Sequence, residues 1–274
     1  MTTYRRLPIV PLREKTGGSA DQDLAEADEI DPTVGYMHSY EITGSVNGPG
    51  IRFMLFLAGC GLRCQYCHNP DTWFMRNGRK VTVDRMIDEI SKYARFVKTA
   101  RGGVTISGGE PMLQYRFLDH LIARIKSDLD LHVALDTSGF LGDRATEEFL
   151  DNIDLVLLDI KSFKPDLYKL VTSVDVEPTL RFARRLSDRR LPAWIRFVLV
   201  PGLTDDPENI EQLADFVASL QNVDRFEVLP FHQLGMGKWE ELGIPYQLRD
   251  VLPPPNEQVA EVLEIFRSRG LPVY

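Results

Sequence analysis

The chain carries its three cysteines in one short stretch, Cys60-Gly61-Leu62-Arg63-Cys64-Gln65-Tyr66-Cys67. The apolar run 53–58 directly before it is typical of a buried strand, so the cysteines lie on a loop at a strand end. Thiolates this close in the sequence can all turn toward one soft metal centre. Cysteine sulfur selects zinc, copper(I) or iron–sulfur clusters.

The number of thiolates narrows the choice of metal centre. A structural zinc site uses four closed ligands, and an electron-transfer cubane uses four thiolates. Three thiolates leave one iron of a cubane without a protein ligand, and an open metal position is where a small molecule can bind and react. The alternative is a zinc knuckle with His68 as the fourth ligand. Because Cys67 and His68 are neighbours, and adjacent residues rarely both point at one tetrahedral ion, the pattern favours the cluster.

The composition describes an ordinary globular protein. At 274 residues, with 43% hydrophobic and 26% charged residues, the chain can hold one large or two small domains. Three cysteines cannot supply a disulfide framework, and reduced thiols indicate the cytoplasm. The net charge of −8 argues against nucleic-acid binding. No apolar stretch approaches the ~20 residues of a membrane span, so no membrane association is expected.

The first 35 residues differ from the rest of the chain. Residues 19–31 contain six acidic side chains and no basic one. The apolar segment 7–12 is too short and too interrupted by proline for a signal-peptide core. We therefore expect a flexible amino-terminal extension over 1–35 and one folded domain over 36–274.

From Tyr36 onward, apolar strand-like runs alternate with amphipathic helical segments. The predicted strands are 52–58, 103–107, 132–136, 155–159, 193–200 and 225–229. The predicted helices are 82–97, 113–125, 145–152, 178–187, 207–220 and 256–269. Six successive strand–helix units predict a parallel α/β fold, either a doubly wound sheet or an incomplete barrel.

In both of these folds, active-site residues lie at the carboxyl ends of the strands. Polar or charged side chains occur at every predicted strand end. They are the cysteine loop, 107–111, 136–139, 159–161, Arg196 and His232. Groups of these kinds can bind a zwitterionic nucleoside, so the sequence predicts an active site there.

The spacing C-x3-C-x2-C, with an aromatic residue before the last cysteine, is similar to the signature of the radical S-adenosylmethionine enzymes. Further segments resemble glycyl-radical-enzyme activases of that superfamily, and together they cover about 35–274. They are 48–52, 67–73, 107–110, 136–137, 155–161, 194–196, 200–202, 229–235 and 238–239. The absence of further cysteines and the chain length resemble the pyruvate formate-lyase type. This resemblance implies a partial (β/α)6 TIM-type barrel.

The resemblance also implies the site residues. Cys60, Cys64 and Cys67 would ligate one [4Fe–4S] cluster, whose open iron binds S-adenosylmethionine. The implied cofactor-binding residues are Tyr66, Cys67, His68, Gly109, Asp159, Ile160, Lys161, Arg196 and His232. Oxygen donors suit a hard cation, and the family implies a monovalent cation at Asp136, Thr137, the Leu157 carbonyl and Asp159.

The implied reaction is hydrogen abstraction by a 5′-deoxyadenosyl radical from a glycine Cα of pyruvate formate-lyase, which needs no acid–base residue. A reduced flavodoxin or ferredoxin as electron donor and a monomeric state are also expected. The family usually has aspartate where this chain has Asn47, which bears on recognition of the partner's glycine loop. Three alternatives remain open: activation of another glycyl radical enzyme, a radical enzyme acting on a small molecule, and a zinc-binding interaction module.

Overall fold

The computed structural model describes residues 29–274, which divide into two compact units. The amino-terminal unit comprises 29–61 and Asp71–Leu158, and the carboxyl-terminal unit comprises Leu62–Pro70 and Asp159–Tyr274. The cysteine stretch therefore begins in one unit and ends in the other. Most of the expected extension, 1–35, lies outside the described residues. Within 29–274, every helix is too short or too polar to span a bilayer.

The amino-terminal unit is built on a sheet with the strand order β3-β1-β2-β4-β5-β6. Neighbouring strands from β2 to β6 are parallel, whereas β1 pairs antiparallel with both β2 and β3. The strands are β1 (Val34–Gly44), β2 (Arg52–Leu57), β3 (Arg79–Thr82), β4 (Gly103–Gly108), β5 (His132–Thr137) and β6 (Leu155–Asp159).

Continuous apolar runs explain the parallel strands. In β2, every residue but one is buried, because strands of a covered parallel sheet have no solvent face. The register aligns Leu57 of β2 with Gly108 of β4. It also aligns Asp136 of β5 with Leu157 of β6. The carboxyl ends of these strands therefore lie level, so the residues that follow them share one edge of the sheet.

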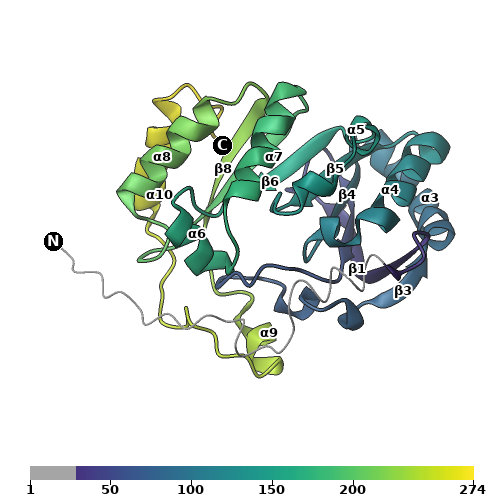
Figure 1. The fold of residues 1–274 in the computed structure, drawn as a ribbon, viewed down its shortest axis with the longest axis horizontal. Coiled ribbons are helices and arrows are strands. Elements are labelled where there is room, and N and C mark those ends of the chain that lie inside the picture. Colours follow the sequence, from purple (N-terminus) through teal and green to yellow (C-terminus); the bar gives the residue numbers. More distant parts are fainter. Residues whose placement is uncertain (1–28) are drawn as a thin grey trace. The chain divides into compact units, whose positions relative to one another are not determined.

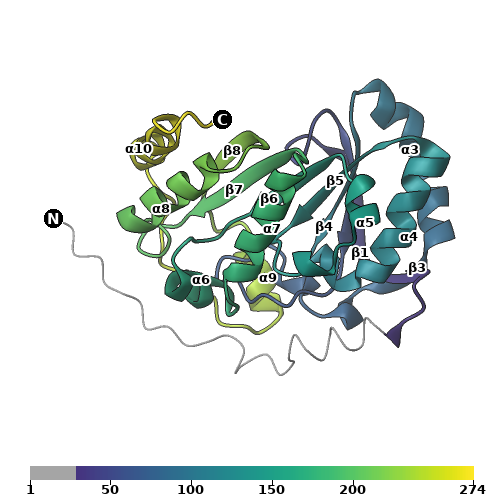
Figure 2. The ribbon, with the colours of Figure 1, turned by 45° about the horizontal axis from the view of Figure 1, so that its top comes forward.

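The described helices of this unit include α3 (Val83–Thr99), α4 (Tyr115–Arg124) and α5 (Glu147–Asp151). Threonine hydroxyls cap two of them, Thr82 accepting from the Arg85 N–H and Thr146 from the Phe149 N–H. Helices α3 and α4 lie side by side (Figures 1 and 2). Short helical turns cover Pro70–Thr72, Met75–Asn77, Pro111–Gln114 and Gly142–Arg144, and a π-helical turn covers Ile125–Leu129.

The carboxyl-terminal unit contains one pair of parallel strands, β7 (Ala193–Leu199) and β8 (Val223–Pro230). Asp206 caps α8 by accepting from the Asn209 N–H. Helices α8 and α10 lie next to one another (Figures 1 and 2). The helices of this unit are α6 (Pro165–Thr172), α7 (Glu177–Asp188), α8 (Pro207–Ala218), α9 (Met236–Glu241) and α10 (Asn256–Arg267).

All six predicted strands and all six predicted helices are confirmed, with shifts of a few residues at their ends. Strands β1 and β3 and helices α6 and α9 were not predicted from the sequence. Strand β1 already includes Val34 and Gly35, which pair with Thr82 and Val81. It contains polar residues and is only partly buried, which is typical of a strand near a sheet edge rather than of an apolar run.

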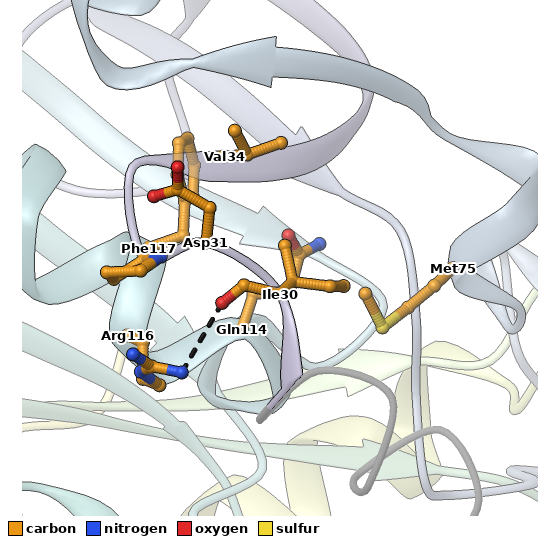
Figure 3. Close-up of a pocket in the computed structure, with 8 residues that line it drawn as sticks. Ile30, Asp31, Val34, Met75, Gln114, Arg116 and Phe117 are labelled. Atoms are coloured by element: carbon orange, nitrogen blue, oxygen red, sulfur yellow. Dashed lines mark hydrogen bonds between the residues drawn. The ribbon is translucent and has the colours of Figure 1, made fainter.

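A small hollow opens beside the start of β1 in the amino-terminal unit (Figure 3). Arg116 Nη1 closes one side by donating to the Ile30 carbonyl at 3.3 Å. Met75 and Gln114 also line it. Its described lining includes none of the predicted cluster or cofactor residues.

Arg52 begins β2 as a fully buried guanidinium held by oxygen acceptors. Its Nε donates to Thr105 Oγ1 at 2.8 Å, and its Nη2 donates to the Val104 carbonyl at 2.6 Å. Burial lowers the pKa of Arg52 to about 10. Its Nη2 also lies 3.2 Å from His132 Nδ1. Burial and the charge of Arg52 lower the pKa of His132, against the opposing effect of Asp154.

This depressed pKa predicts a loss of stability in mild acid. Unfolded His132 takes up a proton near pH 6.5, whereas the folded chain takes it up only at lower pH. The unfolded state therefore binds more protons below pH 6.5, and the free energy of unfolding falls as the pH drops toward the folded pKa. We expect His132→Gln to reduce this slope by up to about 1 kcal/mol per pH unit between pH 6.5 and 5.5.

Urea unfolding at pH 7.5, 6.5 and 5.5 measures this slope. The control is His120→Gln, which removes an exposed imidazole from α4. If wild type and His132→Gln show the same slope, the assignment to His132 is wrong.

Candidate cluster and cofactor site

Main-chain hydrogen bonds anchor the cysteine stretch in both units. In the amino-terminal unit, the Cys60 N–H donates to the Trp73 carbonyl at 3.0 Å. In the carboxyl-terminal unit, the Arg63 N–H donates to the Thr172 carbonyl at 2.7 Å, at the end of α6. The Cys67 N–H then donates to the Cys64 carbonyl at 3.1 Å. A loop without regular secondary structure is thus held in a defined path.

The three cysteines are thiols, and two of them are buried. Burial raises the pKa of Cys64 to about 12, although the charge of Lys161 opposes this. Cys64 is therefore protonated at neutral pH until a metal displaces the proton. Among residues 29–274, no three His, Cys, Asp or Glu side chains converge on the position of a single ion. A cubane does not require such convergence, because each thiolate binds a different iron.

Asp159 lies between two cations in the carboxyl-terminal unit. Its Oδ2 lies 3.0 Å from Lys161 Nζ, and its Oδ1 lies 2.8 Å from Arg196 Nε. Burial raises the pKa of Asp159, but the charges of Arg196 and Lys161 outweigh burial and lower that pKa. Burial lowers the pKa of Lys161, but Asp159 raises it well above the usual value. This triad is fully charged at neutral pH and carries one net positive charge, which suits an anionic ligand group.

Ile160 and Tyr66 lie beside the triad. The Ile160 N–H donates to the Arg196 carbonyl at 3.0 Å, which joins the end of β6 to β7 within this unit. The Lys161 ammonium lies 5.7 Å from the centre of the Tyr66 ring. The Tyr66 hydroxyl is buried and has no hydrogen-bond partner among the described residues. An unsatisfied buried hydroxyl costs roughly 1–3 kcal/mol, so a bound molecule that pairs with it would recover this cost.

His68 and His232 form a pair in the same unit. His68 Nε2 lies 3.1 Å from His232 Nδ1, so one ring donates to the other. Burial, His232 and Lys238 lower the pKa of His68. His68 is thus a neutral imidazole at neutral pH, able to exchange hydrogen bonds with polar groups of a nucleoside.

Gly109 follows β4 in the amino-terminal unit and leaves no room for a side chain. A Cβ there would lie 2.3 Å from the Gly59 carbonyl oxygen and 3.1 Å from the Cys60 Cβ. The Gly109 N–H donates to the Leu57 carbonyl at 2.9 Å, and this bond keeps Gly109 close to the residues that follow β2. Glycine at 109 therefore lets the end of β4 pack directly against the start of the cysteine stretch.

We expect Gly109→Ala to displace Cys60 and to lower the iron bound per chain at least twofold, because the added methyl group meets fixed backbone. The matched control is Gly237→Ala, where a Cβ meets nothing within 4 Å. Iron and sulfide analysis after anaerobic reconstitution measures the effect. Equal cluster loading of the two variants would contradict this account of Gly109.

Glu110, at the end of β4, has a carboxylate that is engaged entirely within the amino-terminal unit. It is 2% exposed and accepts four hydrogen bonds, from Thr137 Oγ1, from the Ser138 N–H and hydroxyl, and from the Met112 N–H. These four donors use most of the acceptor capacity of a carboxylate. Burial raises the pKa of Glu110, and the bonds from Ser138 and Thr137 oppose this. Glu110 thus joins the ends of β4 and β5.

The expected cation ligands of the amino-terminal unit lie on neighbouring strands, since Asp136 on β5 is in register with Leu157 on β6. Asp136 Oδ2 accepts from Ser107 Oγ at 2.9 Å, and Asn47 Nδ2 lies 3.5 Å away. Thr137 Oγ1 gives its proton to Glu110 at 2.6 Å and accepts from the Gly139 N–H. The hydroxyl thus presents an oxygen whose proton already points elsewhere, which suits a cation ligand.

The radical SAM superfamily model matches residues 54–217 of the chain. Pyruvate formate-lyase-activating enzymes from Staphylococcus epidermidis and Staphylococcus aureus are each 47% identical over 243 residues, which cover 86% of this chain and 96% of the relative. The chain belongs to the pyruvate formate-lyase-activating enzyme family. It is thus a radical enzyme of the oxidoreductase class whose cofactors are a [4Fe–4S] cluster and S-adenosylmethionine.

One solved structure from this family and one that shares only the fold also match the chain. A domain of a pyruvate-formate lyase-activating enzyme from Bacteroides vulgatus matches with a TM-score of 0.50 and 28% identity, covering 63% of this chain and 98% of that one. A radical SAM methyltransferase from Sphaerobacter thermophilus matches with a TM-score of 0.59 and 16% identity, covering 97% of this chain and 83% of that one. The predicted α/β fold of the partial (β/α)6 TIM type is confirmed.

The cofactors fit the side chains of this activase. Three thiols on one loop supply the soft ligands of a cluster with an open iron. The charged triad and the unpaired Tyr66 hydroxyl offer partners to a zwitterionic nucleoside. The partly buried hydrogen bond from Trp239 to the Cys67 carbonyl could not be predicted from the sequence. No periodicity in the sequence signals such a bond.

Proposed function

We propose that this activase generates a glycyl radical on pyruvate formate-lyase. The observation that carries the proposal is the three-thiol loop, whose last residues share one compact unit with the charged triad Asp159, Lys161 and Arg196. A zwitterionic nucleoside bound beside the cluster would have the charged side chains of the triad available as partners.

Each residue group has a part in this proposal. Cys60, Cys64 and Cys67 hold the [4Fe–4S] cluster. The residues that bind S-adenosylmethionine are Tyr66, Cys67, His68, Gly109, Asp159, Ile160, Lys161, Arg196 and His232. Arg196 offers a rigid fork and Lys161 a point charge, so both can hold carboxylate or ribose oxygens. Tyr66 offers its ring face, and its hydroxyl gains a partner.

The cluster, held by Cys60, Cys64 and Cys67, would supply the electron for reductive cleavage of S-adenosylmethionine, and the cleaved cofactor would supply the radical chemistry that takes a hydrogen atom from the partner's glycine Cα. The protein's own residues bind and orient and do not transfer protons. Burial of Cys60, Cys64 and Tyr66 limits the access of water to this part of the site. No side chain of the chain is therefore assigned as acid or base.

A monovalent cation is proposed at Asp136, Thr137, the Leu157 carbonyl and Asp159. The register of β5 and β6 supports the first three as neighbours. Oxygen donors of these kinds suit hard cations. A cation bound to them would add positive charge for the carboxylate of S-adenosylmethionine.

The partner, the electron donor and the location complete the proposal. The names of the Staphylococcus relatives support pyruvate formate-lyase as the protein substrate. We propose a reduced flavodoxin or ferredoxin as donor, a monomeric activase and a cytoplasmic location. Asn47 lies at the limit of hydrogen-bond distance from Asp136. It would meet the partner's glycine loop with a neutral amide, where the family usually has a carboxylate.

The test is to incubate the reconstituted activase with reductant and S-adenosylmethionine, with and without pyruvate formate-lyase. We expect 5′-deoxyadenosine and methionine in equal amounts, and their formation should be coupled to the partner. Cleavage stimulated by a metabolite rather than by the partner would favour a radical enzyme for small molecules. Stoichiometric zinc with no cleavage would favour the interaction module.

A further inference from the structure

The carboxyl-terminal segment 232–239 holds the end of the cysteine loop through side-chain hydrogen bonds. Trp239 Nε1 donates to the Cys67 carbonyl at 2.8 Å. Its neighbour Lys238 Nζ donates to Asn69 Oδ1 at 2.9 Å. Both bonds lie within the carboxyl-terminal unit and join residues about 170 positions apart in the sequence. Consecutive residues of α9 thus hold the loop at and just beyond its third cysteine.

The same segment also contacts His68, between these two points. His232 Nδ1 lies 3.1 Å from His68 Nε2. A Cβ on Gly235 would lie 3.0 Å from the His68 Cα, so a larger residue at 235 would press against the His68 backbone. We call the segment 232–239 the clasp, because it contacts each of the three residues 67–69.

Trp239 is buried in the carboxyl-terminal unit and packs against a second aromatic ring. Its side chain is fully buried, and its ring lies 5.2 Å from that of Tyr246. A buried indole N–H needs an acceptor, and the Cys67 carbonyl supplies it. The bond fixes the peptide plane between Cys67 and His68. Since rotation of this plane would move the Cys67 side chain, the bond also restrains the direction of its sulfur.

We propose that Trp239 is a positioning residue for the cluster, acting through Cys67, and that the clasp holds the third thiolate and His68 in place together. This inference rests on the proposed function. Trp239 would thus help to retain the cluster although its side chain does not ligate iron. Without the indole N–H, the Cys67 carbonyl loses a buried donor, and the third iron–sulfur bond is less restrained.

The test is Trp239→Phe, which keeps an aromatic ring and removes only the N–H donor. On the reconstituted holoenzyme, we would measure iron release to a ferrous chelator and the electron paramagnetic resonance spectrum of the reduced cluster. We expect release about five- to tenfold faster than in wild type and shifted g-values. The proposal is overturned if the g-values stay at their wild-type values and iron release rises only in proportion to a lower urea midpoint. That result would show that Trp239 stabilises the fold and does not position the cluster.

Two further variants complete the test, one as a control outside the clasp and one as a second change within it. Trp194→Phe makes the same change on β7, where Trp194 stacks with Arg225, and should keep wild-type release and spectrum. Lys238→Met removes the bond to Asn69 without touching the buried ring, and should raise iron release about twofold even if Trp239→Phe folds poorly. Wild-type behaviour in both clasp variants overturns the inference. A wild-type chain that binds no cluster overturns the proposed function itself.

Discussion

Replacing Cys64 by alanine is expected to reduce cleavage of S-adenosylmethionine below detection. The chain has three cysteines and no spare thiol, so two remaining thiolates cannot hold the cluster with its three protein ligands. Cys64 is 8% exposed and small. Its loss should therefore cost only about 1 kcal/mol of folding stability, leaving a folded but inactive chain.

Three measurements on Cys64→Ala separate chemistry from folding. Iron and sulfide analysis should show less than half of the wild-type cluster, and 5′-deoxyadenosine should be undetectable by liquid chromatography. The urea midpoint of the metal-free variant should remain close to that of the metal-free wild type. Retention of cofactor cleavage by Cys64→Ala would show that the cysteine loop is not the cluster site.

Replacing Asp159 by asparagine is expected to have the largest effect on stability. The substitution leaves Lys161 and Arg196, whose side chains are 11% and 10% exposed, without the carboxylate between them. Breaking a buried ion pair from one side leaves uncompensated charge. Because the Asp159 side chain keeps 24% exposure, we expect a loss of roughly 2–3 kcal/mol, somewhat less than for a fully buried pair.

Urea unfolding of the metal-free protein measures this loss. The matched control is Asp175→Asn, whose partner Lys169 and own side chain are 64% and 75% exposed. An exposed pair contributes little, so the control should unfold like wild type. Equal midpoints for Asp159→Asn and Asp175→Asn would show that the triad does not stabilise the fold. Weaker binding of S-adenosylmethionine by Asp159→Asn is also expected.

The sequence predicted those parts of the fold that depend on local patterns. Apolar runs identified β2 and β4 because a strand buried on both faces must be apolar throughout. Strand β1 was missed because it is only partly buried, and its pairing with β2 and β3 is not visible in its own residues. Helix α9 was missed because six residues are too few for a periodic signal.

Candidate site residues could be named from the sequence where a metal-binding or charged residue type falls at a predicted strand end. The cysteines and the 159–161 segment are of this kind. The partners of Glu110 were not predictable, because Thr137 and Ser138 reach it from another strand end. The bond from Trp239 to Cys67 spans 172 positions and depends on tertiary packing. Such long-range side-chain bonds leave no pattern in a single sequence.

The most direct test of the central claim is an electron paramagnetic resonance measurement of the partner. Reconstituted activase, reductant and S-adenosylmethionine would be mixed anaerobically with pyruvate formate-lyase, once unlabelled and once grown with α-deuterated glycine. The account predicts an organic radical doublet that requires every component, collapses on deuteration and is accompanied by deuterium in 5′-deoxyadenosine. Cofactor cleavage with no partner radical, or a radical signal unchanged by glycine deuteration, would contradict it.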